Sequence, residues 1–451
     1  MTANGGAPHV VVIGAGFCGL TAAYELAKRG VRVTVLEKDA EIGGLAGSFS
    51  VNGTRLEKFY HHWFTSDQHI ISLIDELGAA DQIVLRPTRT GLFYANSIFR
   101  LSSPLDVLRF QPLPLIDRMR LGLLALRVRR IRDWRLLENV KATEWLRQMA
   151  GNRVYEVVWE PLLRGKFGDY LEHVSAVWFW NKVKLRGGSR NKGGGEQLAY
   201  YQGGFAALAD RLAKDIRAQG GSIRTEAHVT RLMAAEEQCV GVVVGSECIA
   251  ADAVIATSAL PIVADLVAPY VTADYVSRLR RIKYLGNICL VLELDRSLST
   301  TYWLNVNDPG FPFVGVIEHT NFEPSETYGG RHIVYLSKYL PDTDPHFLMS
   351  DEEILDYTLP YLKKMFPEFS REWVQGFHLW RARYSQPVVE CNYGEMMPSC
   401  STPLRRLYLS SMAQIYPEDR GTNYAVREGR RVAGMVRETL AFPSANLSTT
   451  K

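Results

Sequence analysis

Three glycines near the start of the chain have the spacing of a dinucleotide-binding turn. Gly14, Gly16 and Gly19 form the pattern G-x-G-x-x-G. In such a turn the first glycine permits the tight bend, the second lets the backbone approach a pyrophosphate, and the third lets a helix pack closely on a strand. Glu37, about twenty residues further on, can accept hydrogen bonds from both ribose hydroxyls and would repel a 2′-phosphate. These residues predict that the chain binds a dinucleotide.

A second glycine pair follows the glutamate. Gly43 and Gly44 come six residues after Glu37, past the point where a nicotinamide site is complete. Another pair of glycines indicates that the backbone comes close to a ligand a second time. We therefore expect a ligand that extends beyond the ribose.

The surrounding residues predict the elements that such a turn requires. Residues 10–14, VVVIG, are β-branched and predict a strand that is buried on both faces. Residues 20–29 have their apolar side chains at helical spacing, and Gly30 ends this helix. Residues 31–36 predict a second strand, which ends at Glu37. The order of strand, turn, helix, strand and acid predicts a Rossmann-like unit.

Residues 12–44 read VIGAGFCGLTAAYELAKRGVRVTVLEKDAEIGG. They resemble the N-terminal signature of FAD enzymes related to flavin amine oxidases, protoporphyrinogen oxidases, phytoene desaturases and UDP-galactopyranose mutases. The resemblance implies FAD as the cofactor, with the second glycine pair along its flavin side. Where that family often has Arg after the pair, this chain has Leu45. The candidate FAD-binding residues are Gly14, Gly16, Phe17, Cys18, Gly19, Glu37, Lys38, Gly43, Gly44, Leu45, Val229, Met412, Thr422, Asn423 and Tyr424.

The resemblance covers most of the chain and implies a discontinuous FAD-binding domain. Its expected pieces are residues 8–70, 195–265 and 380–440. A substrate domain should comprise residues 71–194, which read as mainly helical, and residues 266–379, whose strand-like runs should form a sheet facing the flavin. Residues 441–451 are expected to be a C-terminal tail. The predicted fold class is α/β, α+β overall: a Rossmann-like domain with a mixed sheet-plus-helix substrate domain.

The later FAD segments are expected to return to the first one. Residues 202–219 resemble a helix of the family, and residues 222–232, SIRTEAHVTRL, a single following strand in which Val229 contacts the adenine. Residues 252–260 resemble the strand that closes this segment, and residues 407–433 a final strand, loop and helix. Backbone N–H groups at the start of that last helix are expected to hold the O2 region of the flavin.

The stretch FYHHWFTSD, residues 59–67, should run near the flavin because it follows the second glycine pair. A histidine in this position would contact substrate or flavin and tune a proton transfer near neutral pH. The alternative is that one histidine is a core residue and the other is exposed. Adjacent strand residues point to opposite faces, so only one of His61 and His62 should face the cavity, and no metal site is expected. The stretch also resembles the His-rich loop of UDP-galactopyranose mutases.

Flavin amine oxidases usually carry a lysine that holds a water molecule at the flavin N5, on a strand before a turn such as Asp-Arg. If Asp295-Arg296 is that turn, Cys289 stands where the lysine would be. This departure weakens an amine-oxidase assignment, and Cys289 is expected to be a small core residue.

Tyr384, Tyr393 and Tyr416 lie near the return segments, where aromatic residues of the family often line the substrate cavity. The candidate catalytic residues are therefore His61, His62, Tyr384 and Tyr416. Arg420 follows in a polar loop just before the last helix. It would neutralise an anionic substrate or the flavin, or it would form a surface ion pair with Glu418.

Composition restricts the class of protein. The chain has 451 residues, of which 47% are hydrophobic and 22% charged, which predicts a globular protein with more than one domain. The formal net charge of +4 is mild and no nucleic-acid-reading motif accompanies it, so no nucleic-acid partner is expected. Six scattered cysteines without a CxxC pair indicate reduced thiols. With neither a signal peptide nor a membrane-spanning run, the expected location is cytoplasmic.

Residues 118–135 contain seven Arg and a single acid, Asp133. Apolar residues interleave with them at helical spacing: Leu121, Leu124, Val128 and Ile131. A basic amphipathic helix of this kind can lie on an anionic membrane. The alternative is a helix that turns its apolar face to the core and its basic face to solvent. Peripheral membrane contact through this stretch stays open, as does the oligomeric state.

The leading interpretation is an FAD-dependent oxidoreductase in which a hydride leaves a carbon of a small-molecule substrate for flavin N5. Oxidase, dehydrogenase and desaturase chemistry all fit, and the departure at Cys289 favours a lipid-like or sugar-linked substrate over an amine. One alternative is a redox-neutral sugar-nucleotide mutase that uses reduced flavin. Another is a non-enzymatic binding protein resembling Rab GDP-dissociation inhibitors, against which the intact glycines and Glu37 argue.

Overall fold

A five-stranded parallel sheet forms the base of the molecule. The computed structural model describes residues 7–101, 103–188 and 196–441. The sheet has the order β10-β2-β1-β14-β20 and is built from β1 (His9–Ile13), β2 (Arg32–Leu36), β10 (Ser222–Arg224), β14 (Ala253–Ala256) and β20 (Leu407–Leu409). The central strand β1 is buried along its whole length. Its β-branched run is therefore explained by a position between two layers.

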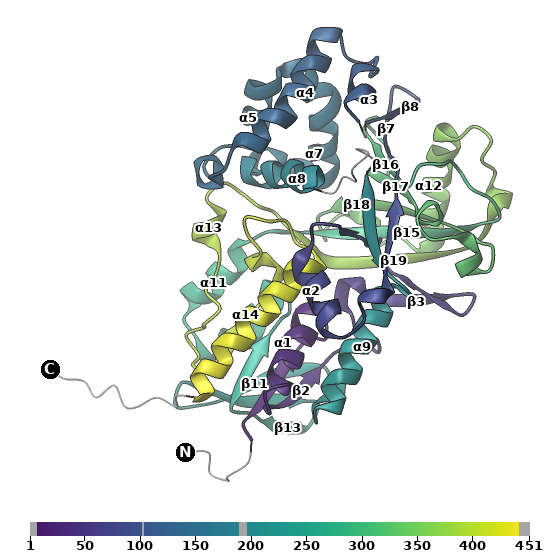
Figure 1. Cartoon of the computed structure of the whole chain (residues 1–451). Coiled ribbons are helices and arrows are strands. Elements are labelled where there is room, and N and C mark those ends of the chain that lie inside the picture. The colour runs from purple at the N-terminus through teal and green to yellow at the C-terminus, as the bar shows by residue number, and fades with distance from the viewer. Residues whose placement is uncertain (1–6, 102, 189–195, 442–451) are drawn as a thin grey trace.

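Helices cover one face of this sheet and a small antiparallel sheet covers the other (Figure 1). The helices are α1 (Phe17–Ala27), α9 (Gly204–Ala218) and α14 (Thr422–Ala441), and they pack on Val10 and Val12 of β1. On the other face, Val11 and Ile13 contact the core of the antiparallel layer. That layer contains β11 (Val229–Ala235), β12 (Gln238–Val244), β13 (Glu247–Ala250) and α10 (Leu260–Val267).

A seven-stranded mixed sheet lies above this unit. Its order is β19-β15-β18-β17-β16-β7-β8, with β7 (Thr90–Tyr94), β8 (Ser97–Arg100), β15 (Tyr284–Leu294), β16 (Trp303–Val306), β17 (Gly315–Glu318), β18 (His332–Leu340) and β19 (Val374–Pro387). One face packs on α12 (Asp351–Met365). The other face shares a core with the helices of the five-stranded sheet, which fixes the two sheets against one another.

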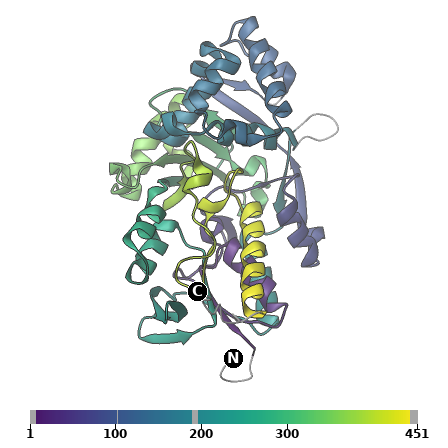
Figure 2. The same ribbon diagram turned by 90° about the vertical axis from the view of Figure 1, so that its left-hand side faces the viewer.

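Helices of the 104–188 segment form the end of the molecule farthest from the five-stranded sheet (Figures 1 and 2). They are α3 (Pro104–Leu108), α4 (Leu115–Arg130), α5 (Ala142–Ala150), α6 (Asn152–Val154), α7 (Glu160–Phe167) and α8 (Ala176–Gly188). We call them the helical part. Among the described residues, no helix combines the length and the apolarity needed to cross a bilayer.

Smaller elements connect these layers. A three-stranded sheet has the order β5-β9-β6 and consists of β5 (Trp63–Phe64), β6 (Ile83–Pro87) and β9 (Gln197–Tyr201). The hairpin β3 (Ser48–Val51) and β4 (Thr54–Glu57) precedes it, and α2 (Gln68–Glu76) follows β5. The remaining helices are α11 (Ala273–Arg281) and α13 (Tyr393–Met396).

The predicted fold class is confirmed, and two expected elements need correction. Residues 222–232 are two strands in different sheets, β10 and β11, because the chain turns between them with Glu226 in the left-handed region at φ 52°. Helix α1 begins at Phe17, three residues before the predicted start, since the glycine turn ends at Gly16.

The division into domains stays a prediction, and strand pairing crosses its boundaries. Residues 380–387, expected in the FAD-binding domain, belong to β19 of the seven-stranded sheet. Strand β9, expected in the FAD-binding domain, pairs with β6, expected in the substrate domain. The predicted C-terminal tail lies outside the described residues apart from Ala441.

The contact of α1 with α14 generates a prediction about one glycine. A Cβ placed on Gly429 of α14 would lie 2.5 Å from the backbone oxygen of Cys18 and 2.8 Å from Cβ of Thr21, both on α1. We therefore expect Gly429→Ala to lower the free energy of unfolding by about 1–3 kcal/mol through overpacking. Denaturant unfolding measures this change.

The matched control is Gly434→Ala, in the same helix, where an added Cβ would meet no atom within 4 Å. Alanine should raise stability there by up to about 1 kcal/mol, because it is the better helix former. Equal effects of the two substitutions would show that the α1–α14 contact does not limit the side chain at 429.

Candidate active site

The two glycine segments contact each other at the carboxyl end of β1. The Gly43 N–H donates to the backbone oxygen of Ala15 at 2.8 Å, and Gly16 and Gly43 form an isolated parallel bridge. A Cβ on Gly44 would lie 3.1 Å from the Cα of Gly16, and Gly44 itself has φ 62°. The second glycine pair is therefore required for its backbone to lie against the backbone of the first glycine turn.

The first turn is equally tight. Gly14 has φ 102°, and a Cβ on it would lie 2.6 Å from the hydroxyl oxygen of Thr257. A Cβ on Gly19 would lie 2.0 Å from the backbone oxygen of Gly14. Only glycine fits at these two positions, so backbone N–H groups and the start of α1 are left open to a ligand phosphate.

Glu37 ties the turn to the end of β2. Its side chain is buried and accepts hydrogen bonds from the backbone N–H of Ala15 at 2.8 Å and of Asp39 at 3.1 Å. Each carboxylate oxygen keeps a further lone pair for a ribose hydroxyl. The bare backbone of the glycine segments and this oriented carboxylate together fit the adenosine and pyrophosphate of a dinucleotide.

The other candidate FAD residues fall into two groups. Phe17 is buried against Phe205, and Cys18 has its Sγ 3.1 Å from the Ser410 hydroxyl, so both face protein. Lys38 is exposed just after β2, Val229 is buried at the start of β11, and Met412 is partly buried. The second group borders the main cavity: Leu45, Thr422, Asn423 and Tyr424.

The cavity has a volume of about 170 Å³ and lies between the seven-stranded sheet, the helical part and the start of α14. Its aromatic lining comes mainly from residues 59–64, with Trp303 of β16 and Tyr339 of β18. Its polar and charged lining comprises His61, His62, Asp67, Lys182, Asn287, Ser385, Asp419 and Arg420. Segments far apart in the sequence therefore build one site.

The histidine-containing segment is fixed to the start of α14. The indole N–H of Trp63 donates to the Thr422 hydroxyl at 2.7 Å, and the backbone N–H of Ile70 donates to the side-chain oxygen of Asn423 at 3.0 Å. These bonds use the two side chains and leave the first backbone N–H groups of the helix for a ligand.

Both histidines border the cavity, which corrects the expectation that only one can face it. That expectation assumed strand geometry, whereas residues 60–62 precede β5 and are irregular. His62 bonds through Nδ1 to the hydroxyl of Tyr302 at 3.0 Å. His61 bonds through Nδ1 to the backbone oxygen of Phe59, which makes Nδ1 the donor and leaves Nε2 as an acceptor.

Burial lowers the pKa of His61 to about 4, and the charge of Arg420 acts in the same direction. The imidazole is therefore neutral at pH 7 and can accept, but not release, a proton there. His61 is suited to accept a hydrogen bond from a substrate O–H or N–H group.

Asp67 borders the cavity with a carboxyl whose pKa is shifted toward neutral pH. Burial raises the pKa of its carboxyl to about 6, although the carboxyl accepts a hydrogen bond from the Phe64 N–H at 2.9 Å. A carboxyl that holds its proton near neutral pH is a candidate acid or base. Asp67 is the last residue of the stretch FYHHWFTSD, and its position there predicted no role for it.

A buried ion cluster forms one wall. Asp419 lies 2.5 Å from Nζ of Lys182 and 3.5 Å from Nζ of Lys166. Although burial opposes ionisation, the two lysines hold the pKa of Asp419 well below its usual range. Gln386 also donates to this carboxylate, at 3.1 Å. Asp419 is therefore committed to the protein and is not available as a base.

Arg420 adds a further cation beside this cluster. Its guanidinium donates to the hydroxyl of Tyr339 at 3.0 Å, while its Nε is buried with no hydrogen-bond partner. The side-chain oxygen of Asn287 is also buried without a partner, whereas its amide donates to Ser337. Of the two possibilities left open for Arg420, the cavity position holds: Glu418 pairs instead with Arg427.

Three other candidates lie away from the cavity. Tyr384 packs edge-on against Tyr284, and Tyr416 packs between Trp134 and Tyr393, so neither hydroxyl reaches the cavity lining. Cys289 is fully buried inside the seven-stranded sheet, and burial raises the pKa of its thiol. It is the core residue that the sequence suggested.

Sequence reasoning missed residues that only the fold brings to the cavity. They are Asn287, Trp303, Tyr339 and Ser385, with Asp67 and Asp419 from stretches that had been noticed for other residues. Of these residues, Asn287 had the clearest sequence signal of a place at the site, because it lies two positions before Cys289 and therefore on the same face of the strand.

The profile of the family described as flavin containing amine oxidoreductase matches residues 17–437. The chain belongs to this family. Its cofactor is FAD, and it is an FAD-dependent oxidoreductase. The family assignment accords with the glycine cradle and Glu37 at one end of the site and with the cavity at the other.

Curated relatives match only parts of the chain. Coproporphyrinogen III oxidase of Propionibacterium freudenreichii subsp. freudenreichii is 27% identical over 178 residues, which are 37% of this chain and 33% of that protein. Putrescine oxidase of Kocuria rosea is 33% identical over 153 residues, 31% of each chain. These alignments span a third or less of either relative.

Solved structures match over nearly the whole length. A candidate protoporphyrinogen oxidase from Exiguobacterium sp. 255-15 superposes with a TM-score of 0.76 at 16% identity, covering 96% of this chain and 99% of that one. Reduced UDP-galactopyranose mutase gives a TM-score of 0.74 at 14% identity, covering 98% and 97%. At these identities the similarity shows a shared fold.

Glu37 generates a prediction about cofactor affinity. We expect Glu37→Ala to weaken FAD binding about tenfold or more, because a charge-assisted hydrogen bond to ribose contributes about 1.5–3 kcal/mol. Titration of the apoprotein with FAD, followed by flavin fluorescence, measures the dissociation constant. Glu352→Ala, at an exposed position of α12, is the control. An unchanged constant in Glu37→Ala would mean that this carboxylate only braces the turn.

Asp67 generates a prediction about pH. Because the folded pKa is raised to about 6, the protonated carboxyl contributes stability that is present at low pH and is lost as pH rises through about 6. Between pH 4.5 and 7.5 the wild type should lose about 2 kcal/mol of unfolding free energy relative to Asp67→Asn. Denaturant unfolding across this range measures the difference. Parallel curves for the wild type and Asp67→Asn over this range would contradict the prediction.

Proposed function

We propose that this FAD-dependent oxidoreductase removes a hydride from a carbon of an anionic substrate that is not an amine. The observation that supports this most directly is the positive charge of the cavity. Lys182 and Arg420 border it, and Lys166 lies directly behind. A family named for amine oxidation thus includes a chain whose cavity is suited to the opposite charge.

The charges around the cavity leave a surplus of cations. Asp419 balances one of the two lysines that it contacts, and the second lysine and Arg420 remain. Asp67 is the other acid in the lining, and above its pKa of about 6 it is ionised, which leaves one surplus cation at pH 7. A protonated amine would meet like charge here, whereas a carboxylate or phosphate would be attracted.

The aromatic side chains of the lining support a flat or partly apolar substrate. Tyr60 and Trp303 meet edge to face at 4.9 Å between ring centroids, and His62 meets Trp303 in the same way at 5.8 Å. Aromatic walls bind planar apolar groups over a large area and orient them. An anionic group at Arg420 and an apolar body against these rings would fix a substrate at both ends.

The residues have separate roles in this proposal. Bound FAD accepts the two electrons and the hydrogen that leave the substrate carbon. His61 holds a substrate O–H or N–H through its neutral Nε2, and Asp67 accepts or returns a proton near neutral pH. Asn287 offers its unpaired oxygen to a donor on the ligand. Lys182 and Arg420 position the anionic end.

A redox-neutral sugar-nucleotide mutase is the second candidate. The same cations would suit a diphosphate, since arginine and lysine are the usual partners of phosphate oxygens. The overall similarity to reduced UDP-galactopyranose mutase is compatible with this reading at the level of the fold. The mutase reaction differs from the first proposal because it needs a flavin that is reduced before the substrate binds.

The experiment follows flavin absorbance after anaerobic rapid mixing with panels of carboxylated or phosphorylated compounds and of amines. We expect an anionic compound to bleach the flavin, and Arg420→Gln to raise its dissociation constant about tenfold or more through loss of a charged hydrogen bond. Arg383→Gln, an exposed residue of β19, should leave the constant unchanged.

Three outcomes separate the proposals. Bleaching of the flavin by amines, with the same dissociation constant in Arg420→Gln as in the wild type, would contradict the proposal of an anionic substrate. Turnover of UDP-galactopyranose only after reduction with dithionite would favour the mutase. Bleaching by an anionic compound without dithionite would support the oxidoreductase.

A further inference from the structure

Helix α4 is apolar on two opposite sides. Leu121, Leu124 and Val128 are buried in the core of the helical part. With Ile131, which is partly buried, they form the stripe predicted as a possible membrane-facing side, and burial removes these three from that role. At about 100° per residue, another apolar set lies on the far side of the helix: Leu115, Ile116, Met119, Leu123 and Leu126.

This second set is exposed. Leu115 is 62% exposed, Ile116 61% and Met119 56%. Eight of the twelve large apolar side chains exposed within the described residues lie between 105 and 136: Leu105, Leu108, Leu115, Ile116, Met119, Leu123, Leu126 and Leu136. We call these eight the exposed apolar face. Scattered apolar residues are normal on protein surfaces, but a concentration on one segment marks an interaction site.

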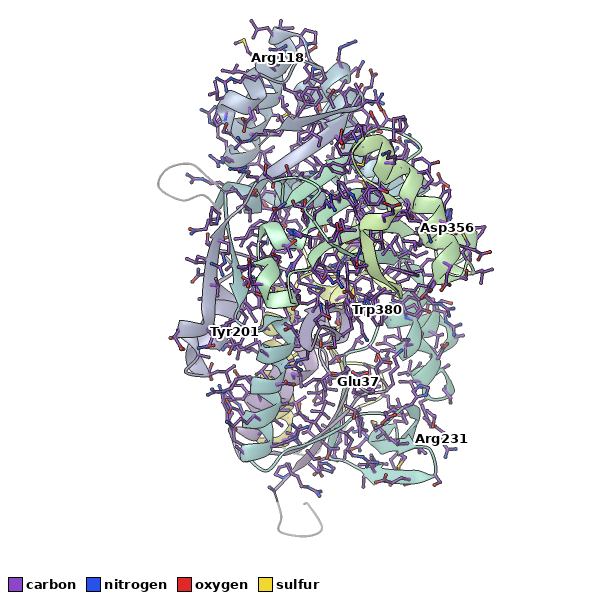
Figure 3. The ribbon with its side chains drawn as sticks, turned by 90° about the vertical axis from the view of Figure 1, so that its right-hand side faces the viewer. Glu37, Arg118, Tyr201, Arg231, Asp356 and Trp380 are labelled. Carbon is purple, nitrogen blue, oxygen red and sulfur yellow. The ribbon has the colours of Figure 1, made fainter. Side chains whose placement is uncertain are left out.

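The exposed apolar face lies at one tip of the molecule. Figure 3 shows Arg118 of α4 at the end opposite Glu37 and Arg231, with Trp380 of the seven-stranded sheet between them. Helix α3 packs against α4 and contributes Leu105 and Leu108. A projecting tip can contact an extended flat surface while the cofactor site and the rest of the molecule stay clear of it.

Arginines border the exposed apolar face. At helical spacing, Arg118 and Arg129 fall on one side of the α4 stripe and Arg120 and Arg127 on the other. The only acid of α4, Asp117, is buried and paired with Arg120 at 2.9 Å. Arg130 and Arg132 extend the positive charge at the end of the helix.

We propose that the exposed apolar face docks onto an anionic lipid bilayer, with the leucines among the acyl chains near the surface and the arginines at the phosphate groups. An exposed apolar stripe between rows of cationic side chains is the arrangement of helices that lie in a membrane interface. The charge is complementary to anionic headgroups. A second copy of the chain would bring like-charged arginine rows together, which disfavours a symmetric dimer through this face.

Flotation with vesicles tests the proposal on the full-length holoprotein. Vesicles of phosphatidylcholine containing phosphatidylglycerol should bind the protein about tenfold or more tightly than vesicles of phosphatidylcholine alone, because each arginine near an anionic surface adds attraction. High ionic strength should weaken this binding. The flavin spectrum of each sample verifies that the protein is folded.

Two groups of variants separate the apolar and the charged contributions. The triple variant Ile116→Ser, Met119→Ser and Leu123→Ser should bind anionic vesicles at least about tenfold more weakly, since it removes the apolar surface that inserts. Its control is Leu348→Ser. Leu348 is 89% exposed and lies outside the exposed apolar face. The double variant Arg130→Gln and Arg132→Gln should weaken binding about tenfold at low ionic strength. Arg281→Gln, exposed on α11, is its control.

Several results would overturn the proposal. One is a wild type that does not float with anionic vesicles. Another is a triple variant that floats as well as the wild type. A third is a wild type that is dimeric without lipid and becomes monomeric in the triple variant, because the face would then join two copies of the chain.

Discussion

The active site depends on the attachment of the histidine-containing segment to the start of α14. Trp63 and Ile70 donate hydrogen bonds to the side chains of Thr422 and Asn423, across more than 350 positions of sequence. This attachment sets the position of His61 and His62 relative to the glycine segments. It also places the start of α14 at the cavity, where Gly421, the residue before the helix, has no side chain to cap the first N–H groups.

The charges around the cavity also come from segments that lie far apart in the sequence. Lys182 comes from the helical part, Arg420 from the loop before α14, and Asp419 is held between two lysines. Burying these charges is tolerated because each is paired or faces the cavity. This positive charge is the basis of the proposed preference for an anionic substrate in a chain that belongs to the flavin-containing amine oxidoreductase family.

Much of the cofactor-binding unit could be predicted from the sequence, because its requirements are local. The positive φ of Gly14, the close approach of Gly19 to Gly14 and the bond from Ala15 to the Glu37 carboxylate all lie within residues 14–37. The substrate side could not be predicted in the same way. Tyr384 and Tyr416 have the right residue type and approximate position, but packing against Tyr284 and Trp134 turns them elsewhere.

The sequence by itself determined the dinucleotide-binding turn, the FAD family and the core position of Cys289, since glycine spacing and strand patterning report backbone geometry directly. Only the tertiary structure decided that both histidines border the cavity, because that depended on irregular backbone at residues 60–62. It also decided which side of α4 is exposed. Both sides of this helix are apolar, so the sequence pattern was ambiguous, and only the packing of the helical part against Leu121, Leu124 and Val128 chose between them.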